Sequence, residues 1–210
     1  MKQAPRQWNY KLDSFLKEFG LNNCESDHCV YVTYMFNSLT ILALYVDDGL
    51  LCSQSKAAIS KIENCLSNRF QVRFGDAESF VGMEIESSPI GIKIHQSSYI
   101  KRLLERFKMV DCKPVLTPGD SYQKLSSEMC PKNELERAQS SKIPYQELVG
   151  ALMFLTSISR PDIAFEVSKA SQFMSNYGEL HWKATKRILQ YLKGTISEPT
   201  VSTTFFVNSS

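Results

Sequence analysis

The sequence contains 210 residues, of which 43% are hydrophobic and 22% are charged, and its formal net charge at pH 7 is only +2. This composition is typical of an ordinary folded protein and excludes a disordered chain, and the small net charge does not mark the whole chain as a nucleic-acid binder. The longest apolar run, residues 39–46, is far shorter than the ~20 residues of a bilayer span, and no apolar stretch follows Met1. We therefore expect an intracellular protein, cytoplasmic or nuclear, with no signal peptide, transmembrane segment or membrane partner.

The six cysteines are scattered without paired spacing, so we expect reduced thiols rather than disulfides. Cys24, His28 and Cys29 lie close together in the sequence, which is compatible with metal binding. No second ligand pair follows them at the spacing of a zinc finger. A turn that enters a strand is therefore the favoured interpretation of this segment.

The first part of the chain predicts helices on one face of a small antiparallel sheet. Apolar residues recur at helical spacing behind Pro5 until Gly20, a residue type that commonly follows a helix end. Two runs rich in β-branched and aromatic residues come next, and Asn37-Ser38 between them is short enough for a hairpin turn. The expected elements are a helix to residue 19, strands over 30–36, 39–46 and 49–53, a helix over 57–69 capped by Ser55, a hairpin of 80–86 and 90–95, and a helix capped by Ser97 or Ser98.

The second part of the chain predicts a linker followed by helices. Residues 117–142 are polar, contain Pro118, Gly119 and Pro131, and show no sustained period, so we expect a domain boundary there. Three helical patterns follow, over 144–157, 161–175 and 179–193.

Two adjacent acidic residues, Asp47 and Asp48, stand behind an apolar strand and before Gly49. Such a pair can be an ordinary hairpin turn, because Asp and Gly both favour turns. It can also bind metal, because phosphoryl transfer uses two Mg²⁺ ions about 3.5–4 Å apart and hard carboxylates are the ligands that they prefer. A rigid hairpin holds carboxylates better than a flexible loop does.

A series of motifs resembles one known family. The segment Tyr45-Val46-Asp47-Asp48 resembles the Tyr-x-Asp-Asp box of reverse transcriptases, and Lys-Gln-Ala-Pro-Arg-Gln-Trp at residues 2–8 resembles the copia-type segment that precedes it. An unrelated α+β domain with an acidic turn would require the whole ordered series to be accidental. The sequence is therefore identified as a member of the copia-type retrotransposon reverse transcriptases, from the C-terminal part of the polymerase domain of a Pol polyprotein. Further motifs that match in order and spacing lie at 80–85, 99–100, 117–118, 144–145, 148–152, 160–164, 181–182 and 191–195.

The resemblance implies an α+β fold with part of a right-hand polymerase palm, an antiparallel sheet with helices on one face, followed by a mainly helical thumb and connection region. We expect the palm and the start of the thumb in residues 1–116 and a flexible linker in 117–142. The helical connection is expected in 143–195. Residues 196–210 depart from the family and form a divergent tail.

The resemblance also implies roles for individual residues. Asp47 is the expected catalytic metal ligand and Asp48 its weaker partner, because neighbouring side chains on extended backbone point to opposite faces. Gln3 matches the position that approaches the incoming nucleotide, Tyr45 the position beside the primer terminus, and Gly82 a hairpin near the primer backbone. A polar helix start, a core tyrosine and a strand glycine remain alternatives for these three. The basic residues expected near nucleic-acid phosphates, or else on solvated helix faces, are Lys101, Arg102, Arg106, Lys183, Lys186 and Arg187.

In the complete enzyme the resemblance implies primer extension on an RNA or DNA template, with deoxynucleoside triphosphates and two Mg²⁺ ions. That site needs a further aspartate from an upstream strand and the fingers, and an RNase H region follows in the family. The sequence begins after the upstream aspartate and the fingers and shows no acidic RNase H cluster, so we expect the chain to be inactive alone. The alternative is a non-catalytic remnant that binds nucleic acid weakly or packs against a partner.

Overall fold

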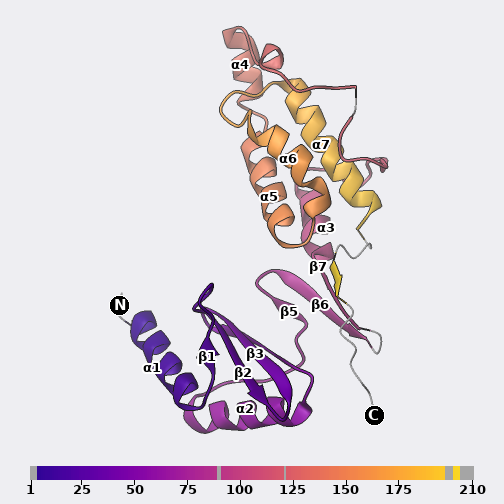
Figure 1. Cartoon of the computed structure of the whole chain (residues 1–210). Helices are drawn as coiled ribbons and strands as arrows, with labels where there is room; N and C mark the ends of the chain where they lie inside the picture. The colour runs from indigo at the N-terminus through magenta and orange to yellow at the C-terminus, as the bar shows by residue number, and fades with distance from the viewer. Residues whose placement is uncertain (1–3, 89–90, 121, 197–200, 204–210) are drawn as a thin grey trace. The chain divides into compact units, whose positions relative to one another are not determined.

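The computed structural model describes residues 4–88, 91–120, 122–196 and 201–203, which form helices and antiparallel strands (Figure 1). The predicted α+β class is confirmed. Contacts divide the chain into two units, the first ending at Val81 and the second beginning at Gly82. No helix in the described ranges is long and apolar enough to cross a membrane.

The first unit is a small antiparallel sheet with two helices. Its strand order is β1-β2-β3-β4, in which each strand is antiparallel to its neighbour. The elements are α1 (Ala4–Glu18), β1 (Asn22–Asn23), β2 (Val30–Met35), β3 (Ser38–Tyr45), β4 (Asp48–Ser53), α2 (Lys56–Arg69) and β5 (Ser79–Phe80).

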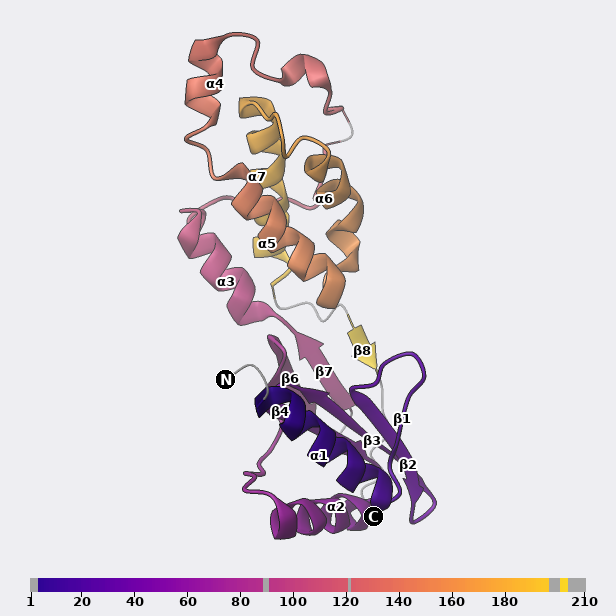
Figure 2. The same cartoon turned by 90° about the vertical axis from the view of Figure 1, so that its left-hand side faces the viewer.

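The core of this unit lies between the sheet and its helices (Figure 2). Side chains from both helices pack against one face of the sheet, as predicted. The Tyr31 hydroxyl also donates a hydrogen bond to Asp13, at 2.8 Å, which ties β2 to α1. Because side chains alternate along a strand, burial of one face exposes the other. The buried core residues are Leu12, Leu16, Leu21, Tyr31, Leu42, Ile62 and Leu66.

The cap of α2 and the β2–β3 turn lie where the sequence predicts them, except that the turn is shifted by one residue. Ser55 caps α2, where its hydroxyl accepts a hydrogen bond from the Ala58 amide, as expected. The β2–β3 turn is Phe36-Asn37 rather than Asn37-Ser38, and both residues have positive φ, at 50° and 59°. A two-residue hairpin turn with positive φ at both positions matches the twist of the strands, so Ser38 is left to pair in β3.

The second unit contains a hairpin and a helical cluster. Strand β7 pairs antiparallel with β6 and also with β8, which lies in the tail that the sequence predicted only as divergent. Short 3₁₀ helices lie at Ser127–Met129 and Pro161–Ile163. The elements are β6 (Met83–Ser88), β7 (Gly91–His95), α3 (Ser97–Arg106), α4 (Glu134–Ser140), α5 (Tyr145–Ile158), α6 (Ala164–Ser171), α7 (Glu179–Gly194) and β8 (Val201–Thr203).

Helix α3 explains why the two units divide at Gly82, upstream of the boundary expected within 117–142. Its apolar face packs with α5, α6 and α7 in one core, so α3 belongs with the helices that follow it. The sequence shows that this face is apolar but not what covers it. The buried core residues are Ile100, Leu103, Leu104, Leu148, Leu152, Leu155, Ile163, Val167, Ile188, Leu189 and Leu192.

The segment 117–142 also contains regular structure that the sequence analysis did not predict. Helix α4 begins after Asn133, whose side chain accepts a hydrogen bond from the Glu136 amide at 2.9 Å. The Glu136 carboxylate in turn accepts a hydrogen bond from the Lys132 amide at 2.7 Å. An Asn followed three residues later by Glu is a helix-start signal, which the polar composition of the segment obscured.

The buried side chain of Arg160 joins the end of α5 to the end of α7 and forms an ion pair with Asp162. Arg160, only 4% exposed, donates to both carboxylate oxygens of Asp162, at 2.9 and 2.7 Å, and to the Thr195 hydroxyl at 2.6 Å. Burial by itself would raise the pKa of Asp162, but the hydrogen bonds and charge of Arg160 outweigh it and hold that pKa below its usual value. The motif at 160–164 therefore includes an arginine that stabilises the contact between the ends of α5 and α7.

We predict that Leu152→Ala lowers the free energy of unfolding of the second unit by about 2–5 kcal/mol, because it leaves a cavity among fully buried side chains. Urea unfolding can be followed by the fluorescence of Trp182, which packs against this core, in a Trp8→Phe background. Met153→Ala, at a neighbouring side chain that is 46% exposed, is the control and should cost less than about 1 kcal/mol. Equal losses for both variants would contradict this core.

We further predict that Asp162→Asn weakens the acid sensitivity of the second unit. A carboxyl with a lowered folded pKa stabilises the fold above its unfolded pKa of about 3.9 and loses that contribution as the pH falls through the folded pKa. The wild type should therefore lose stability below about pH 4 more steeply than Asp162→Asn does, as measured by urea unfolding at several pH values. Asp111→Asn, at an exposed turn, serves as the control and should follow the wild type.

Candidate active site

The two acidic residues lie at the tip of the β3–β4 hairpin. Tyr45 pairs with Asp48 at the end of the ladder, and Val46 and Asp47 form the two-residue turn between them. The predicted antiparallel pairing, with both acids at or beside the turn, is confirmed. Both aspartates are exposed, so their carboxylates are open to ligands.

The turn holds Val46 in an unusual conformation. Its φ is +55°, a value that costs a β-branched residue because Cβ crowds the backbone. The side chain is 78% exposed, so little packing offsets this cost. Strained backbone of this kind is frequent at functional sites, where it fixes neighbouring groups in place.

The register determines which face each site residue occupies. Leu42 is buried among the helices and pairs with Leu51, so the alternate pair Tyr45 and Asp48 lies on the opposite face of the sheet. Asp47 is in the turn itself. The expected ranking of Asp47 above Asp48 stays a prediction.

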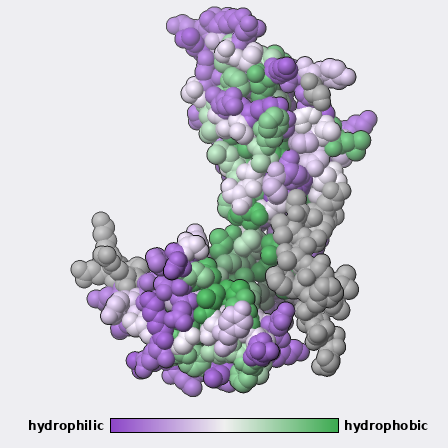
Figure 3. All heavy atoms as spheres, in the orientation of Figure 1, coloured by the Kyte–Doolittle hydropathy of each residue, from purple (hydrophilic) through white to green (hydrophobic). Residues whose placement is uncertain are grey.

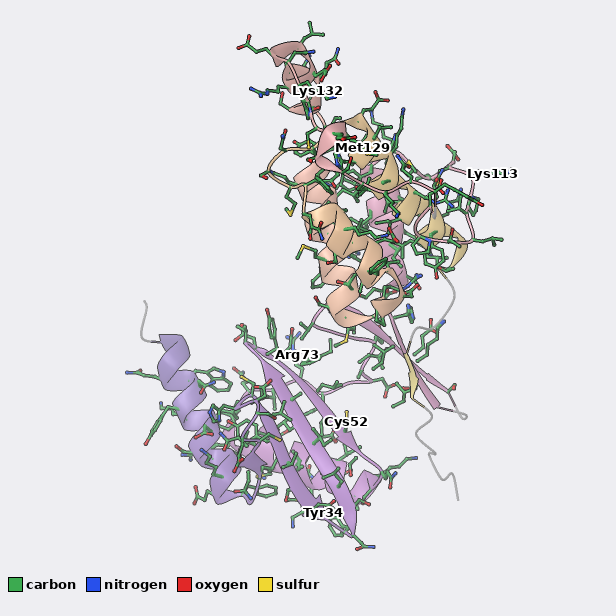
Figure 4. All side chains as sticks on the ribbon, turned by 45° about the horizontal axis from the view of Figure 1, so that its top comes forward. Tyr34, Cys52, Arg73, Lys113, Met129 and Lys132 are labelled. Atoms are coloured by element: carbon green, nitrogen blue, oxygen red, sulfur yellow. The ribbon has the colours of Figure 1, made fainter. Side chains whose placement is uncertain are left out.

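The face that carries Tyr45 and Asp48 is apolar along its length. Figure 3 shows hydrophobic residues gathered over the strands of the first unit, and hydrophilic residues over α1. Tyr34 and Cys52, labelled in Figure 4, belong to this face. The other members by register are Val30, Val32, Leu39, Ile41, Ala43 and Leu50.

The metal-binding capacity of the described residues is limited. Nowhere in ranges 4–88, 91–120, 122–196 and 201–203 do three or more His, Cys, Asp or Glu side chains gather closely enough to hold a metal ion. Asp47 and Asp48 fit Mg²⁺ by chemistry, because carboxylate oxygens are its preferred ligands, but they supply only two carboxylates from one turn.

Gly82 lies in the second unit, immediately before β6. Its φ is +78°, and a Cβ there would lie 3.3 Å from the Phe154 ring, so both backbone conformation and space favour glycine. The carbonyl of Gly82 accepts a hydrogen bond from the buried side chain of Gln96 at 3.3 Å. The sequence analysis singled out Gly82 but not Gln96, because nothing local distinguishes Gln96 from other polar residues before a helix.

Helix α3 begins differently from the prediction. Neither Ser97 nor Ser98 is the N-cap residue; Gln96 occupies that position and makes no capping hydrogen bond with its side chain. Instead the Glu84 carboxylate accepts hydrogen bonds from the amide and hydroxyl of Ser98, at 2.8 and 2.7 Å. Burial would raise the pKa of Glu84, but these bonds and the nearby charges keep it below its usual value.

The basic residues predicted to contact phosphates differ in their partners within the protein. Arg106 is paired with Glu147, Lys183 with Glu179, and Arg187 donates to the Thr117 hydroxyl, while Lys186 lies over the Trp182 ring and Arg102 over the Tyr99 ring. Exposed ion pairs of this kind contribute little and can be exchanged for another anion. Neither Lys101 nor Arg102 forms an ion pair within the part of the chain that the structure describes. Gln3 lies outside the described residues.

Comparison with known proteins decides the family. The profile described as "Reverse transcriptase (RNA-dependent DNA polymerase)" matches residues 1–121, which include the acidic hairpin and Gly82. The chain belongs to the reverse transcriptase family. No solved structure matches this reverse transcriptase chain.

Relatives from transposons agree with this assignment. The chain is 43% identical to the retrovirus-related Pol polyprotein from transposon TNT 1-94 of Nicotiana tabacum, over 94% of this chain and 15% of that polyprotein. It is 35% identical to the corresponding polyprotein from transposon RE1 of Arabidopsis thaliana, over 93% of this chain and 13% of the relative. A putative transposon Ty5-1 protein of Saccharomyces cerevisiae is 28% identical, over 94% of this chain and 63% of the relative. The expected copia-type resemblance is confirmed, and the chain spans about a seventh of the Pol polyproteins that it matches.

We predict that Val46→Asn raises the free energy of unfolding of the first unit by about 1 kcal/mol, because Asn tolerates positive φ far better than a β-branched residue. Urea unfolding monitored by Trp8 fluorescence in a Trp182→Phe background measures it. The control is Val72→Asn, at a valine without positive φ, and it should bring no such gain. A loss of stability in Val46→Asn would show that the turn is not strained.

Proposed function

We propose that the chain carries part of the active site of an RNA-directed DNA polymerase of a copia-type retrotransposon. The single observation that carries the proposal is the exposed Asp47-Asp48 pair at the tip of an antiparallel hairpin, in a chain whose residues 1–121 match the reverse transcriptase family. In this proposal the first unit is part of the palm. The helical second unit supplies the thumb and the connection.

Asp47 is the proposed principal metal ligand and Asp48 its partner. Two Mg²⁺ ions, when bound, stabilise the charge that develops as the 3′-oxygen of the primer displaces pyrophosphate. The chain's own contribution is to hold the two carboxylates on a short, strained turn, so that they need not reorganise during reaction. Tyr45 shares a face with Asp48 and is proposed to lie beside the primer terminus.

The template-primer is proposed to run along groups of the second unit as well. The exposed Gly82 turn is proposed to meet the primer backbone through its peptide groups, since the side on which Gly82 lacks a Cβ faces the Phe154 ring. Lys101 and Arg102 are exposed on α3, and Lys183, Lys186 and Arg187 on α7 add basic groups whose affinity for phosphates depends on salt but not on sequence. Deoxynucleoside triphosphates are the proposed second substrate, with Gln3 near them.

We propose that the 210-residue chain does not polymerise DNA by itself. Two divalent ions and a triphosphate need ligands that converge from several strands, and within the described ranges no group of three or more acidic, His or Cys side chains joins the two carboxylates of this turn. The alternative function, a non-catalytic module that binds nucleic acid weakly, is favoured by the basic side chains of α3 and α7, which need no metal site to act.

We predict no primer extension by the purified chain with Mg²⁺, template-primer and all four deoxynucleotides. Joining it to the upstream Pol region of a relative such as the TNT 1-94 polyprotein should restore extension. Asp47→Asn in that longer chain should then lower the rate by a factor on the order of a hundred or more, because one electrostatic element of the site is removed. Single-nucleotide incorporation on a labelled primer measures each rate.

Asp111→Asn, an exposed aspartate on the second unit, is the matched control and should leave the rate of the longer chain unchanged. Extension by the 210-residue chain alone, abolished by Asp47→Asn, would show that it completes the site with its own acids, such as Asp27 or Asp76. Full activity of Asp47→Asn in the longer chain would refute the proposed role of the hairpin.

A further inference from the structure

The Gly82 turn is held by buried polar side chains from two helices. The Gln96 side-chain amide donates to the Gly82 carbonyl at 3.3 Å, and the Ser159 hydroxyl donates to the Gln96 side-chain carbonyl at 2.7 Å. Gln96 and Ser159 are each only 1% exposed. Residues far apart in the sequence therefore converge on one peptide group of the turn.

The direction of these hydrogen bonds is fixed by chemistry. The Gly82 carbonyl can only accept, so the Gln96 nitrogen must face it. The Gln96 oxygen then faces Ser159, whose hydroxyl donates. Removing either side chain would leave a buried polar atom without a partner, which is costly in the protein interior.

The requirements of helix α3 do not explain the choice of Gln96. The residue occupies the N-cap position, where Ser, Thr, Asp or Asn would accept a backbone amide, yet its side chain makes no capping bond. Glu84 caps the helix instead, through Ser98. Gln96 is thereby free to bind the Gly82 turn, two residues before Glu84.

Packing holds the other side of the turn. A Cβ on Gly82 would lie 3.3 Å from the Phe154 ring, and Phe154 in turn packs edge-on against Tyr99 at 5.2 Å between ring centroids. The Gly82 backbone is thus fixed both by hydrogen bonding and by aromatic contact. Such fixation is what a backbone group that must meet a ligand in one geometry requires.

We propose that Gln96 and Ser159 are positioning residues, which hold the Gly82 turn in the geometry that contacts one phosphate of the primer strand. The inference rests on the proposed function, in which the Gly82 turn meets the primer backbone. Neither residue touches nucleic acid itself. Gln96 engages the Gly82 carbonyl, so a backbone N–H of the turn, and not that carbonyl, is the donor proposed for the phosphate oxygen. Ser159 sets the orientation of the Gln96 amide.

The test measures binding of the full 210-residue chain to an RNA–DNA template-primer by fluorescence anisotropy. A series of primers carries a single uncharged methylphosphonate at successive positions near the 3′ end. Neutralising the phosphate that meets the Gly82 turn should weaken binding by the wild type about tenfold, the loss of one strong hydrogen bond. In Gln96→Met the same neutralisation should change affinity less than about twofold, because the contact is already lost.

Two further measurements separate positioning from general destabilisation. The salt dependence of affinity should be the same in wild type and Gln96→Met, because the lysine and arginine contacts are unchanged. Ser159→Ala keeps Gln96 in place and should reduce the sensitivity to the methylphosphonate only in part. If circular dichroism shows that Gln96→Met is unfolded, the result for Ser159→Ala alone tests the positioning role. Gln139→Met, at an exposed glutamine of α4, is the matched control and should behave as wild type.

The outcomes distinguish this inference from the proposed function. If wild type, Gln96→Met and Ser159→Ala all show the same sensitivity to one phosphate, the positioning role is wrong and the primer contact stands. If the wild type binds template-primer without sensitivity to any single phosphate, or does not bind at all, the primer contact of Gly82 and the inference built on it both fail.

Discussion

The antiparallel pairing of β3 with β4 is the constraint on which the candidate site depends. Leu42 and Leu51 pair on the face that the helices cover, and the period of a strand then assigns every other residue of the hairpin to a face. A shift of register by one residue would bury Tyr45 and Asp48 and expose the leucines. Burial of apolar area by α1 and α2 therefore determines the orientation of a polar site at the far end of the same strands.

The turn shows how such a site is kept rigid. Only two residues, Val46 and Asp47, connect the strands, so the aspartates have little freedom relative to the sheet. The positive φ of Val46 is a local cost that the rest of the hairpin offsets. A longer or looser turn would relieve that cost, but it would also let the carboxylates move, which is unfavourable for the metal-binding role proposed for them.

The second unit is organised by buried polar contacts as well as by its core. Arg160 joins the ends of two helices, and Gln96 with Ser159 joins two helices to the Gly82 turn. Buried hydrogen bonds with every partner present give modest net stability, but they are strict about geometry, because each unsatisfied atom is costly. Such contacts agree with the proposal that the Gly82 turn presents its backbone in a defined geometry.

The sequence by itself determined the elements and the family. Helical apolar patterns predicted every described α-helix except α4, and an apolar run followed by two acids and a glycine predicted the β3–β4 hairpin. The motif at Tyr45–Asp48 with the others in order predicted a copia-type reverse transcriptase. Local signals also predicted the Ser55 cap, but the cap signal at Asn133 lay hidden in a polar segment.

Only the tertiary structure decided that α3 belongs with the later helices, that Glu84 rather than a serine caps it, and that Gln96 binds Gly82. The physical reason is the distance along the chain over which each interaction acts. Propensity, period and capping act between residues within about four positions of each other, and a sequence displays them directly. The partner of a buried amide or of an apolar helix face is chosen by packing across many residues, which the sequence does not display.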